Sequence, residues 1–274
     1  MNWEYPGHDL VLEAYVGKKA AEMLRVVAAD LHIHTCLSPC GDLDMTPTKI
    51  VRQALEKNLA MIAITDHNSA ENTPAIIAAA QGTDLFIIPG MEVTTSEEAH
   101  IVALFDKTES ALSMQALIYD SLQAGENDED VFGIQVVANE FDEVENINKR
   151  LLIGATELSV SRVVEAIHDR EGLAIAAHID RESFSLVGQL GFIPEDLALD
   201  AIEISRHMTL SDARARFKEY ESFPFITSSD AHFPDDIGTS PTMFQVARPD
   251  MAELRLALAG REGRKVIEEL RHGQ

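Results

Sequence analysis

Short apolar segments alternate with segments of helical periodicity along most of this chain. Apolar runs of strand length cover residues 26–33, 60–65, 85–89, 100–105, 173–177, 201–205, 223–228 and 243–247. Between them, apolar residues recur at three- and four-residue spacing, in segments 46–57, 73–82, 107–124, 159–171 and 211–220. A strand followed by a helix, repeated six or seven times, predicts parallel strands with helices outside. The pattern therefore predicts an α/β barrel-like fold.

Turn and cap residues divide the same segments. Thr46 followed by Pro47, and Thr73 followed by Pro74, are typical of helix starts, because proline fits the first helical turn. Ser159 is a predicted helix cap, Gly172 a predicted helix end, and Pro249 a predicted start of the last helix.

Two segments depart from this alternation. Residues 1–25 form a predicted N-terminal extension with a short amphipathic helix; the alternative is that translation begins at Met23. Residues 125–147 carry eight acidic side chains around a short apolar run at 134–138. We interpret this stretch as an acidic excursion from the core near 125–150. The domain prediction is therefore one barrel domain over residues 26–274.

Composition narrows the classes of partner. The chain has 274 residues and a formal net charge of −24, which disfavours long nucleic acid because polyanion binding depends on Lys and Arg. A small phosphorylated substrate stays compatible, since bound cations reverse the charge locally. No apolar run is long enough to span a bilayer, so no membrane is expected. Only two cysteines occur and no signal-peptide pattern is present, which predicts a cytoplasmic protein. The oligomeric state stays open.

Histidines and acids gather where the predicted strands end. They are His32, His34, His67, Glu92, His100, His178, Asp230 and His232, and every one except His100, at a strand start, ends or follows an apolar run. Strand ends in α/β barrels meet at one face, where active sites lie. Nitrogen and oxygen donors delivered there from many points in the sequence predict a multinuclear metal site.

The spacing within each motif supports that prediction. His32 and His34 alternate on a strand, so both imidazoles face one side. Asp230 and His232 repeat this spacing at another strand end. His178 ends an apolar strand, where an unpaired imidazole would be costly. A structural histidine is the alternative for each residue taken singly.

Several neighbouring side chains are candidates for supporting roles. Asp66, next to His67, is a candidate catalytic residue that orients His67 or shares in proton transfer. Arg181 and Arg206 are candidates for holding phosphate, with surface ion pairs as the alternative. Cys40 could bind metal, although Cys36 and Cys40 form only a weak zinc motif, so packed or tolerated thiols are the alternative.

The order of these motifs resembles the PHP (polymerase and histidinol phosphatase) family of metal-dependent phosphoesterases. The resemblance runs from Asp30 to His232 and covers His-x-His, Thr-Asp-His, Gly-x-Glu, isolated histidines and Asp-x-His. It implies a distorted (β/α)7 TIM-like barrel that holds two or three divalent metal ions. It also implies a first metal on His32, His34, Glu92 and Asp230, a second on Glu92, His100 and His178, and a third on His67 and His232.

One departure from the family pattern lies in the loop after His-x-His. Family members often supply a further histidine or aspartate to the third metal from this loop, whereas this chain has Ser38-Pro39-Cys40-Gly41-Asp42. Cys40 and Asp42 are both open as replacements.

The predicted function is hydrolysis of a small phosphate mono- or diester with Zn, Mn or Fe, which lower the pKa of a shared water and neutralise phosphoryl charge. The alternatives are an amidohydrolase-like enzyme that cleaves a C–N bond and a non-catalytic metal-binding accessory module. Substrate and metal identity stay open.

Overall fold

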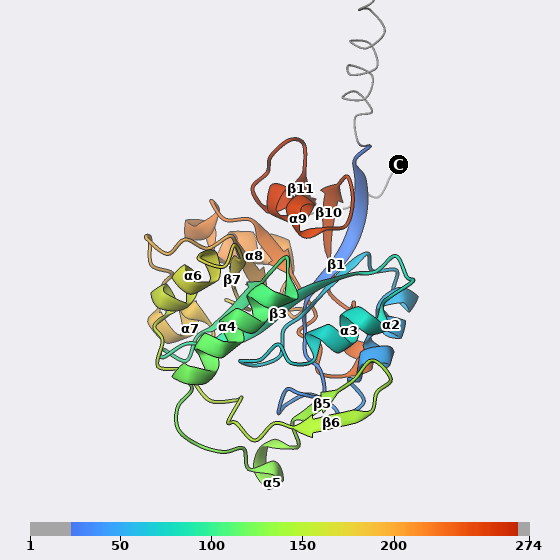
Figure 1. Ribbon diagram of the computed structural model, residues 1–274. Coiled ribbons are helices and arrows are strands. Elements are labelled where there is room, and N and C mark those ends of the chain that lie inside the picture. The colour runs from blue at the N-terminus through green and yellow to red at the C-terminus, as the bar shows by residue number, and fades with distance from the viewer. Residues whose placement is uncertain (1–22, 268–274) are drawn as a thin grey trace, which may run out of the picture.

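The computed structural model describes residues 23–267, and one large sheet runs through it (Figure 1). Nine strands occur in the order β11-β10-β1-β2-β3-β4-β7-β8-β9. Their bounds are β1 Arg25–Ile33, β2 Met61–Ile64, β3 Phe86–Thr94, β4 His100–Leu104, β7 Leu173–Ala176, β8 Ala201–Ile204, β9 Phe225–Thr227, β10 Thr242–Val246 and β11 Lys265–Ile267. The helix expected near the N-terminus falls mostly on residues 1–22, outside the described part of the chain.

Seven of these strands, β1 to β4 and β7 to β9, curve into a barrel-like wall. The wall closes at one end, where Ile33 bridges to Ala231 just beyond β9. There, the His34 N–H donates to the Ala231 carbonyl at 2.9 Å. At the other end of the barrel, the first half of β1 pairs with β10 rather than with β9, so the barrel is open on that side. The predicted distorted (β/α)7 barrel is confirmed.

The expectation of parallel strands throughout is wrong for β10, which runs antiparallel to β1 and β11, and for β4. Strand β4 lies antiparallel to both β3 and β7, with Thr94 opposite His100 and Glu92 opposite Val102. The reason is the connection: β3 continues to Thr94, and five residues then return the chain directly to β4, too few for a crossover to a parallel strand. Reversal brings the start of β4 to the edge where its neighbours end.

The helices cover the outside of the wall and follow the strands that they connect. Their bounds are α2 Pro47–Glu56, α3 Thr73–Ala79, α4 Thr108–Ser121, α5 Glu129–Phe132, α6 Val160–His168, α7 Leu186–Leu190, α8 Leu210–Arg216 and α9 Met251–Leu258, with 3₁₀ turns η1 Lys218–Tyr220 and η2 Pro234–Asp236. The last helix begins two residues after Pro249, because Asp250 accepts a hydrogen bond from the Glu253 N–H as its cap. The short α7 had no sequence signal. No helix in residues 23–267 combines the length and the apolar character that crossing a membrane requires.

The buried apolar residues divide into an interior and a covering layer. One cluster takes residues from all seven barrel strands, among them Leu31, Ala63 and Ile88, and therefore fills the barrel. The other two clusters lie between the sheet and its helices, and Ile33 and Val93 belong to these. The barrel interior is thus apolar except at its carboxyl end.

The acidic excursion forms a small separate sheet beside that end. Strands β5 (Val136–Ala138) and β6 (Val144–Ile147) pair as a hairpin. Asn72 tethers the hairpin, because its side-chain amide donates to the Val136 carbonyl at 3.0 Å and accepts from the Ala138 N–H at 3.0 Å. Asn68 donates to the carbonyls of Leu152 and Gly154 at 2.9 and 2.8 Å, and so holds the return segment near the strand ends.

Candidate metal centre

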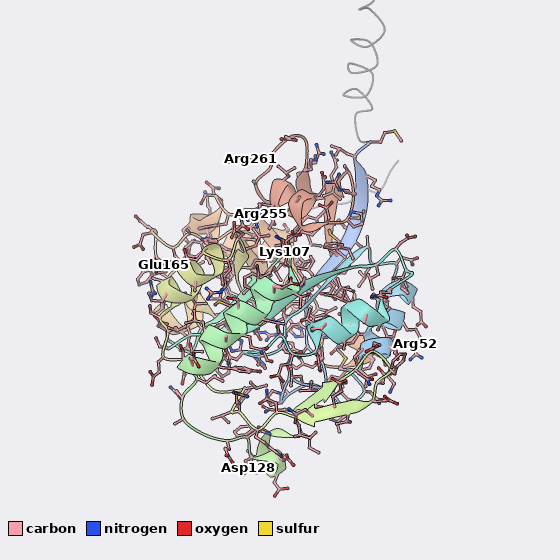
Figure 2. All side chains as sticks on the ribbon, in the orientation of Figure 1. Arg52, Lys107, Asp128, Glu165, Arg255 and Arg261 are labelled. Atoms are coloured by element: carbon pink, nitrogen blue, oxygen red, sulfur yellow. The ribbon has the colours of Figure 1, made fainter. Side chains whose placement is uncertain are left out.

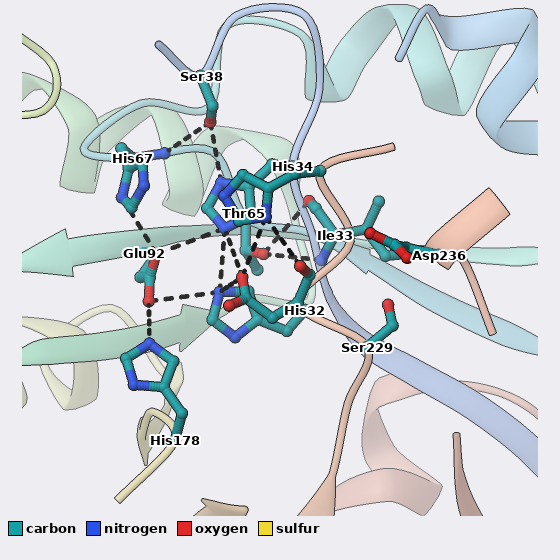
Figure 3. Close-up of polar contacts among 12 residues, drawn as sticks. His32, Ile33, His34, Ser38, Thr65, His67, Glu92, His178, Ser229 and Asp236 are labelled. Carbon is teal, nitrogen blue, oxygen red and sulfur yellow. Dashed lines mark hydrogen bonds and ion pairs between the residues drawn. The ribbon is translucent and has the colours of Figure 1, made fainter. Parts of the chain in front are cut away.

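The eight predicted ligands converge at the carboxyl end of the barrel. Figure 3 shows His32 and His34, from β1, pointing toward Glu92 of β3, with His67 and His178 on either side of that carboxylate. Donor atoms lie within 4.8 Å of one another in three groups: His32, His34 and Glu92; His67, Glu92 and His100; and His34, Cys40, His67 and His232. The antiparallel β4 explains why His100, at a strand start, joins residues at strand ends.

An irregularity in β1 aims both histidines of the His-x-His motif inward. The pairing of β1 with β2 shifts register between Asp30 and Ile33. Before the shift Leu31 faces the barrel interior, and after it Ile33 packs under the outer helices. Bulges of this kind re-aim side chains next to active sites. His32 and His34 thereby face the same interior point, with their Nε2 atoms 3.2 Å apart.

Glu92 lies at the centre of the cluster. Its Oε1 is 2.7 Å from His100 Nδ1, 3.1 Å from His178 Nε2 and 3.4 Å from His32 Nε2. Its Oε2 is 3.1 Å from His67 Nδ1 and 3.4 Å from His34 Nε2. One buried carboxylate therefore reaches five imidazoles, which is the geometry of a bridging ligand.

Asp230 and His178 enter the cluster from strained backbone. Both have positive φ, 49° for Asp230 and 27° for His178. Such conformations are uncommon for residues with a side chain and concentrate at functional sites. Asp230 Oδ1 lies 3.1 Å from His34 Nε2 and 3.4 Å from His32 Nε2. The local strain therefore places a second carboxylate on the His-x-His pair.

The protonation states of the buried side chains indicate how the cluster would bind divalent ions. Burial alone would raise the pKa of Glu92, but the neighbouring His100, His32 and His67 hold it well below its usual range. Burial lowers the pKa of His34 well below its usual value, and lowers that of His100 to about 4. His34 and His100 are therefore neutral imidazoles at pH 7, the form that ligates metal. His178 Nδ1 is buried without a hydrogen-bond partner. Glu203 and Glu92 outweigh burial and hold the pKa of His32 well above its usual value, and Cys40 and Glu92 do the same for His67. Divalent ions bound here would replace the protons on these two imidazoles.

We call His32, His34, Glu92, His100, His178 and Asp230 the inner group, and Cys40, His67 and His232 the outer group. The outer group opens to solvent, since Cys40 is exposed and the His232 side chain is 22% exposed. Desolvation alone would raise the pKa of Cys40, but His67 and His232 lower it to about 6. His232 Nδ1 lies 2.8 Å from the Asp230 carbonyl, which leaves its Nε2 for a ligand. The outer group is thus a thiolate with two imidazoles.

The structure separates the alternatives for the loop after the His-x-His motif. Asp42 is not in a donor cluster among the described residues, and its Oδ1 accepts the Asp44 N–H at 2.7 Å. Cys36 is buried under the excursion, where its thiol contacts the Val136 carbonyl at 3.7 Å, and burial raises its pKa to about 12. Of the two thiols, the structure brings Cys40 to the histidines and keeps Cys36 away.

Asp66 lies behind the ligands rather than beside the pocket. We expected it to orient His67 or to transfer protons. Its oxygens instead accept from the Thr35 N–H at 2.7 Å, the Thr35 hydroxyl at 2.8 Å and the Ser38 hydroxyl at 2.7 Å. Ser38 Oγ is in turn 2.9 Å from His34 Nδ1. Asp66 is therefore linked to the His34 ring through the Ser38 hydroxyl.

The same pattern of aspartate hydrogen bonds recurs at the carboxyl end of the barrel. Asp30 accepts from both the N–H and the hydroxyl of Ser229, at 3.0 and 2.6 Å. Asp180 accepts from both groups of Ser205, at 2.8 and 2.6 Å. As with Asp66 and Thr35, an aspartate at one strand end holds the loop of a neighbouring strand. These hydrogen bonds fix the loops that carry the ligands.

Glu203, in the middle of β8, is a functional candidate that the sequence reasoning missed. It is buried, both its oxygens lie 3.1 Å from His32 Nδ1, and it accepts the His178 N–H at 3.3 Å. A carboxylate on the far nitrogen of a metal-binding histidine fixes the ring and its tautomer. The available signal was a lone acid inside the apolar run Ala-Ile-Glu-Ile, since a buried charge needs a partner.

The two candidate arginines have different surroundings. Arg181 follows β7, lines the pocket and contacts Asp230 Oδ2 at 2.6 Å. Arg206 contacts Asp236 at 2.6 Å and is not among the pocket-lining residues. The structure therefore brings Arg181, but not Arg206, to the cluster.

A pocket of about 180 Å³ lies over the cluster. Outer and inner ligands form its floor, Arg181 lines it, and two apolar residues, Ile153 and Phe184, complete it. The sequence reasoning missed both apolar residues, because Ile153 comes from the return segment after the acidic excursion and Phe184 from a loop without a motif.

Comparisons with known proteins agree with this site. The PHP domain model matches residues 30–185, and the PHP-associated model matches residues 213–264. The 5'-3' exoribonuclease Rnm of Escherichia coli is 40% identical over 87 residues, which are 28% of this chain and 27% of that protein. Rnm of Salmonella typhimurium is 35% identical over 94 residues, 32% of this chain and 31% of that protein. These matches span less than a third of the relatives' length.

A solved structure with the same fold is the lesion-specific endonuclease PfuEndoQ from Pyrococcus furiosus. The TM-score is 0.68 at 20% identity, over 88% of this chain and 58% of the other. A putative metal-dependent phosphoesterase from Bifidobacterium adolescentis gives a TM-score of 0.53 at 19% identity, over 75% of this chain and 88% of the other.

The expectation of a small phosphorylated partner and no long nucleic acid is contradicted by these comparisons. The relatives are exoribonucleases, and endonuclease Q has been solved with a 27-mer duplex. The prediction from net charge failed because net charge is a sum over the whole chain and does not report the charge at the pocket. Figure 2 shows charged side chains such as Arg52, Asp128 and Glu165 at the periphery of the molecule, whereas cations in the cluster would set the field in the pocket.

The family model covers more than half of the chain, and the range that it matches contains six of the converging residues, His32, His34, His67, Glu92, His100 and His178. The chain belongs to the PHP domain family.

Proposed function

We propose that this protein is a metal-dependent phosphoesterase that hydrolyses phosphodiester bonds at the end of a nucleic acid strand. The observation that carries the proposal is the convergence of buried imidazoles on the single carboxylate Glu92, beneath a pocket that opens to solvent. The exoribonuclease relatives support a nucleic acid substrate. The small pocket supports a strand end, because about 180 Å³ is below the ~300 Å³ of pockets that enclose drug-sized ligands.

The proposed ligand sets follow from the distances. His32, His34, Glu92 and Asp230 would hold one ion, and Glu92, His100 and His178 a second, within the inner group. The outer group, Cys40, His67 and His232, would hold a third. Thiolate favours zinc or iron over manganese, whereas the nitrogen and oxygen donors of the inner group accept all three. Such ions supply Lewis acidity toward phosphoryl oxygens and lower the pKa of water.

The chain's own residues bind and orient around that centre. Arg181 contacts Asp230 and lines the pocket, so its guanidinium is placed to hold a phosphate oxygen that arrives beside this carboxylate. Glu203 fixes the ring of His32, and Ser38 with Asp66 fixes that of His34. Ile153 and Phe184 exclude water from one side of the pocket.

The two rival functions have less support. An amidohydrolase-like site would be expected to use a bridging lysine, but no lysine lines the pocket in the described part of the chain, and Glu92 occupies the central position. A non-catalytic module would be expected to lack ligands, yet the described residues retain all eight that the sequence motifs predicted.

The test is hydrolysis of defined oligonucleotides by the purified protein reconstituted with zinc, manganese or iron. We expect mononucleotides released from one end of a single-stranded substrate, with two to three bound ions by elemental analysis. Asp230→Asn should remove turnover. Asp236→Asn, which changes a carboxylate paired with Arg206 away from the pocket, should not. An absence of turnover with every metal, on single strands, duplexes and a chromogenic diester alike, would refute the proposal.

A further inference from the structure

Phe184 is an exposed aromatic residue at the pocket that the proposed chemistry does not use. It is 46% exposed, although it is a large apolar side chain. Its ring stacks on His100 of the inner group, with the centroids 4.9 Å apart and the planes 24° from parallel. It is not among the buried or half-buried residues of the hydrophobic clusters in the described part of the chain. Its ring is therefore partly open to solvent beside the inner group.

The backbone holds Phe184 in that place by several contacts. Its φ is 59°, a left-handed conformation that is unusual for an aromatic residue. Its carbonyl accepts the His100 N–H at 2.9 Å, which ties the loop to the start of β4. The next residue, Ser185, donates to the Arg181 carbonyl at 2.7 Å and accepts the Gly188 N–H at 2.9 Å. A built loop with a strained residue thus presents the ring beside the cluster.

Close packing between α7 and the loop requires a glycine at residue 188. A side chain at Gly188 would meet the Glu182 carbonyl oxygen at 2.4 Å, so only glycine lets α7 approach the loop so closely. The same loop carries Arg181, which contacts Asp230. One segment therefore supplies both a cation and an exposed ring to the pocket.

The surroundings indicate what the ring would contact. One of its faces lies on His100, and nearly half of its surface stays open where it lines the pocket with Ile153. Arg181 is the single Lys or Arg side chain among the described residues that line this pocket, and it is already paired. Because this single guanidinium is paired with Asp230, ion pairs between side chains and phosphate can supply only a small part of the affinity for a strand end. Stacking on aromatic side chains is the sequence-tolerant alternative.

We propose that Phe184 is the stacking platform for the base of the terminal nucleotide. The base would extend the stack formed by Phe184 and His100, and so place its phosphate over the ions held by the inner group. This inference rests on the proposed function and names the contact by which the same site would select a nucleotide over another phosphoester. Because every base has a π-face, the platform predicts little preference among bases.

Steady-state kinetics on paired oligonucleotides test the platform. The substrates are a single-stranded oligonucleotide and the same strand with an abasic terminal residue. For Phe184→Ala we expect KM on the normal strand to rise by about 5- to 150-fold, with KM on the abasic strand changed less than about twofold. Phe184→Tyr should restore the wild-type KM, and metal content should be unchanged. Phe192→Ala is the matched control, because Phe192 is 58% exposed and does not line the pocket. Equal losses on both strands would show a supporting role for His100 only and overturn the proposal.

Direct binding separates this inference from the proposed function. A Phe184→Trp variant reports base contact by fluorescence, measured against a Phe192→Trp control that also contains the natural Trp3. We expect adenosine 5'-monophosphate to quench the tryptophan at position 184, and ribose 5-phosphate to leave it unchanged. If the nucleotide quenches the tryptophan but no substrate is hydrolysed, the stacking proposal stands and the proposed phosphoesterase function fails. Hydrolysis without quenching by the nucleotide would mean the reverse.

Discussion

The inner and outer groups of the metal centre are adjacent, yet they are built in different ways. Most of the inner ligands lie on a strand or within two residues of a strand end. All are buried, and some have supporting partners, such as Glu203 behind His32 and Ser38 behind His34. The outer ligands come from loops, and Cys40 and His232 are open to solvent. A rigid, buried set and a solvent-facing set share one pocket.

The difference has a chemical consequence. The inner group offers only nitrogen and oxygen donors, while the outer group adds a thiolate. Soft and hard donors favour different metals, and accessible ligands exchange faster than buried ones. We therefore expect the inner ions to be retained and the outer ion to be selective for zinc or iron and the first to leave.

The largest effect is expected from Glu92→Gln. Because this carboxylate reaches both inner ligand sets, its loss should remove inner ions and lower kcat by about 1,000-fold, since several kcal/mol of Lewis-acid stabilisation are lost. Turnover and elemental analysis measure this. Glu97→Gln is the control, because Glu97 accepts from the Val160 N–H at the start of α6, away from the pocket. Wild-type activity in Glu92→Gln would show that the inner group is not the reaction centre.

The outer group is tested by its thiol. Cys40→Ser should lower bound zinc by about one equivalent while the inner ions stay, because a neutral hydroxyl is a poor ligand. Cys36→Ser is a matched control four residues away, and should leave the metal content unchanged since this thiol is buried elsewhere. If both variants bind as much zinc as the wild type, the outer group does not hold a metal through sulfur.

The reactivity of the two thiols in the metal-free protein tests the difference between Cys40 and Cys36 without bound ions. The thiolate is the reactive form, and its population rises as pH rises through the pKa. With a pKa of about 6, Cys40 should react with iodoacetamide at half its maximal rate near pH 6, and zinc should protect it. Cys36, with a pKa of about 12, should stay unmodified at neutral pH. Half-maximal labelling of Cys40 near its unperturbed pKa would mean that His67 and His232 do not contact it.

The two groups also differ in how far the sequence predicted them. Alternation on β1 and at Asp230 located the inner ligands, because a strand has a fixed period of two. The bulge that turns His32 inward has no signature in the sequence, and neither does the reversal of β4 that brings in His100. For His100, motif order rather than local pattern indicated the residue.

The loop residues of the outer group and of the pocket wall were harder to predict from the sequence. The choice between Cys40 and Asp42 was open, because it requires the path of the loop after β1, which Asp66 sets from β2 through Thr35 and Ser38. Ile153 and Phe184 come from long connections whose backbone is fixed by contacts distant in sequence. The substrate prediction was wrong for a related reason, since net charge does not report where charges lie.

A smaller effect is expected from Glu203→Gln. Without the carboxylate behind His32, the inner group should bind metal about 10- to 100-fold more weakly. Competition with a chelator measures this affinity. Glu253→Gln is the control, because Glu253 is also buried but is paired with Arg264 at the other end of the sheet. It should lower stability without changing metal affinity. Equal affinity in both variants would mean that His32 needs no orienting partner.

The smallest effects, and the finest comparison, come from the two arginines. Arg181→Ala should lower kcat/KM by about 10-fold, because a charge-assisted hydrogen bond beside Asp230 is lost. Arg206→Ala removes a half-exposed ion pair with Asp236 and should change kcat/KM less than about twofold. Both variants remove one positive charge, so a general electrostatic effect on an anionic strand would lower them equally and weaken with salt. A difference that persists at high salt would assign the phosphate contact to Arg181, beside the inner group. A larger effect from Arg206 would instead move the path of the strand away from Phe184 and toward η2.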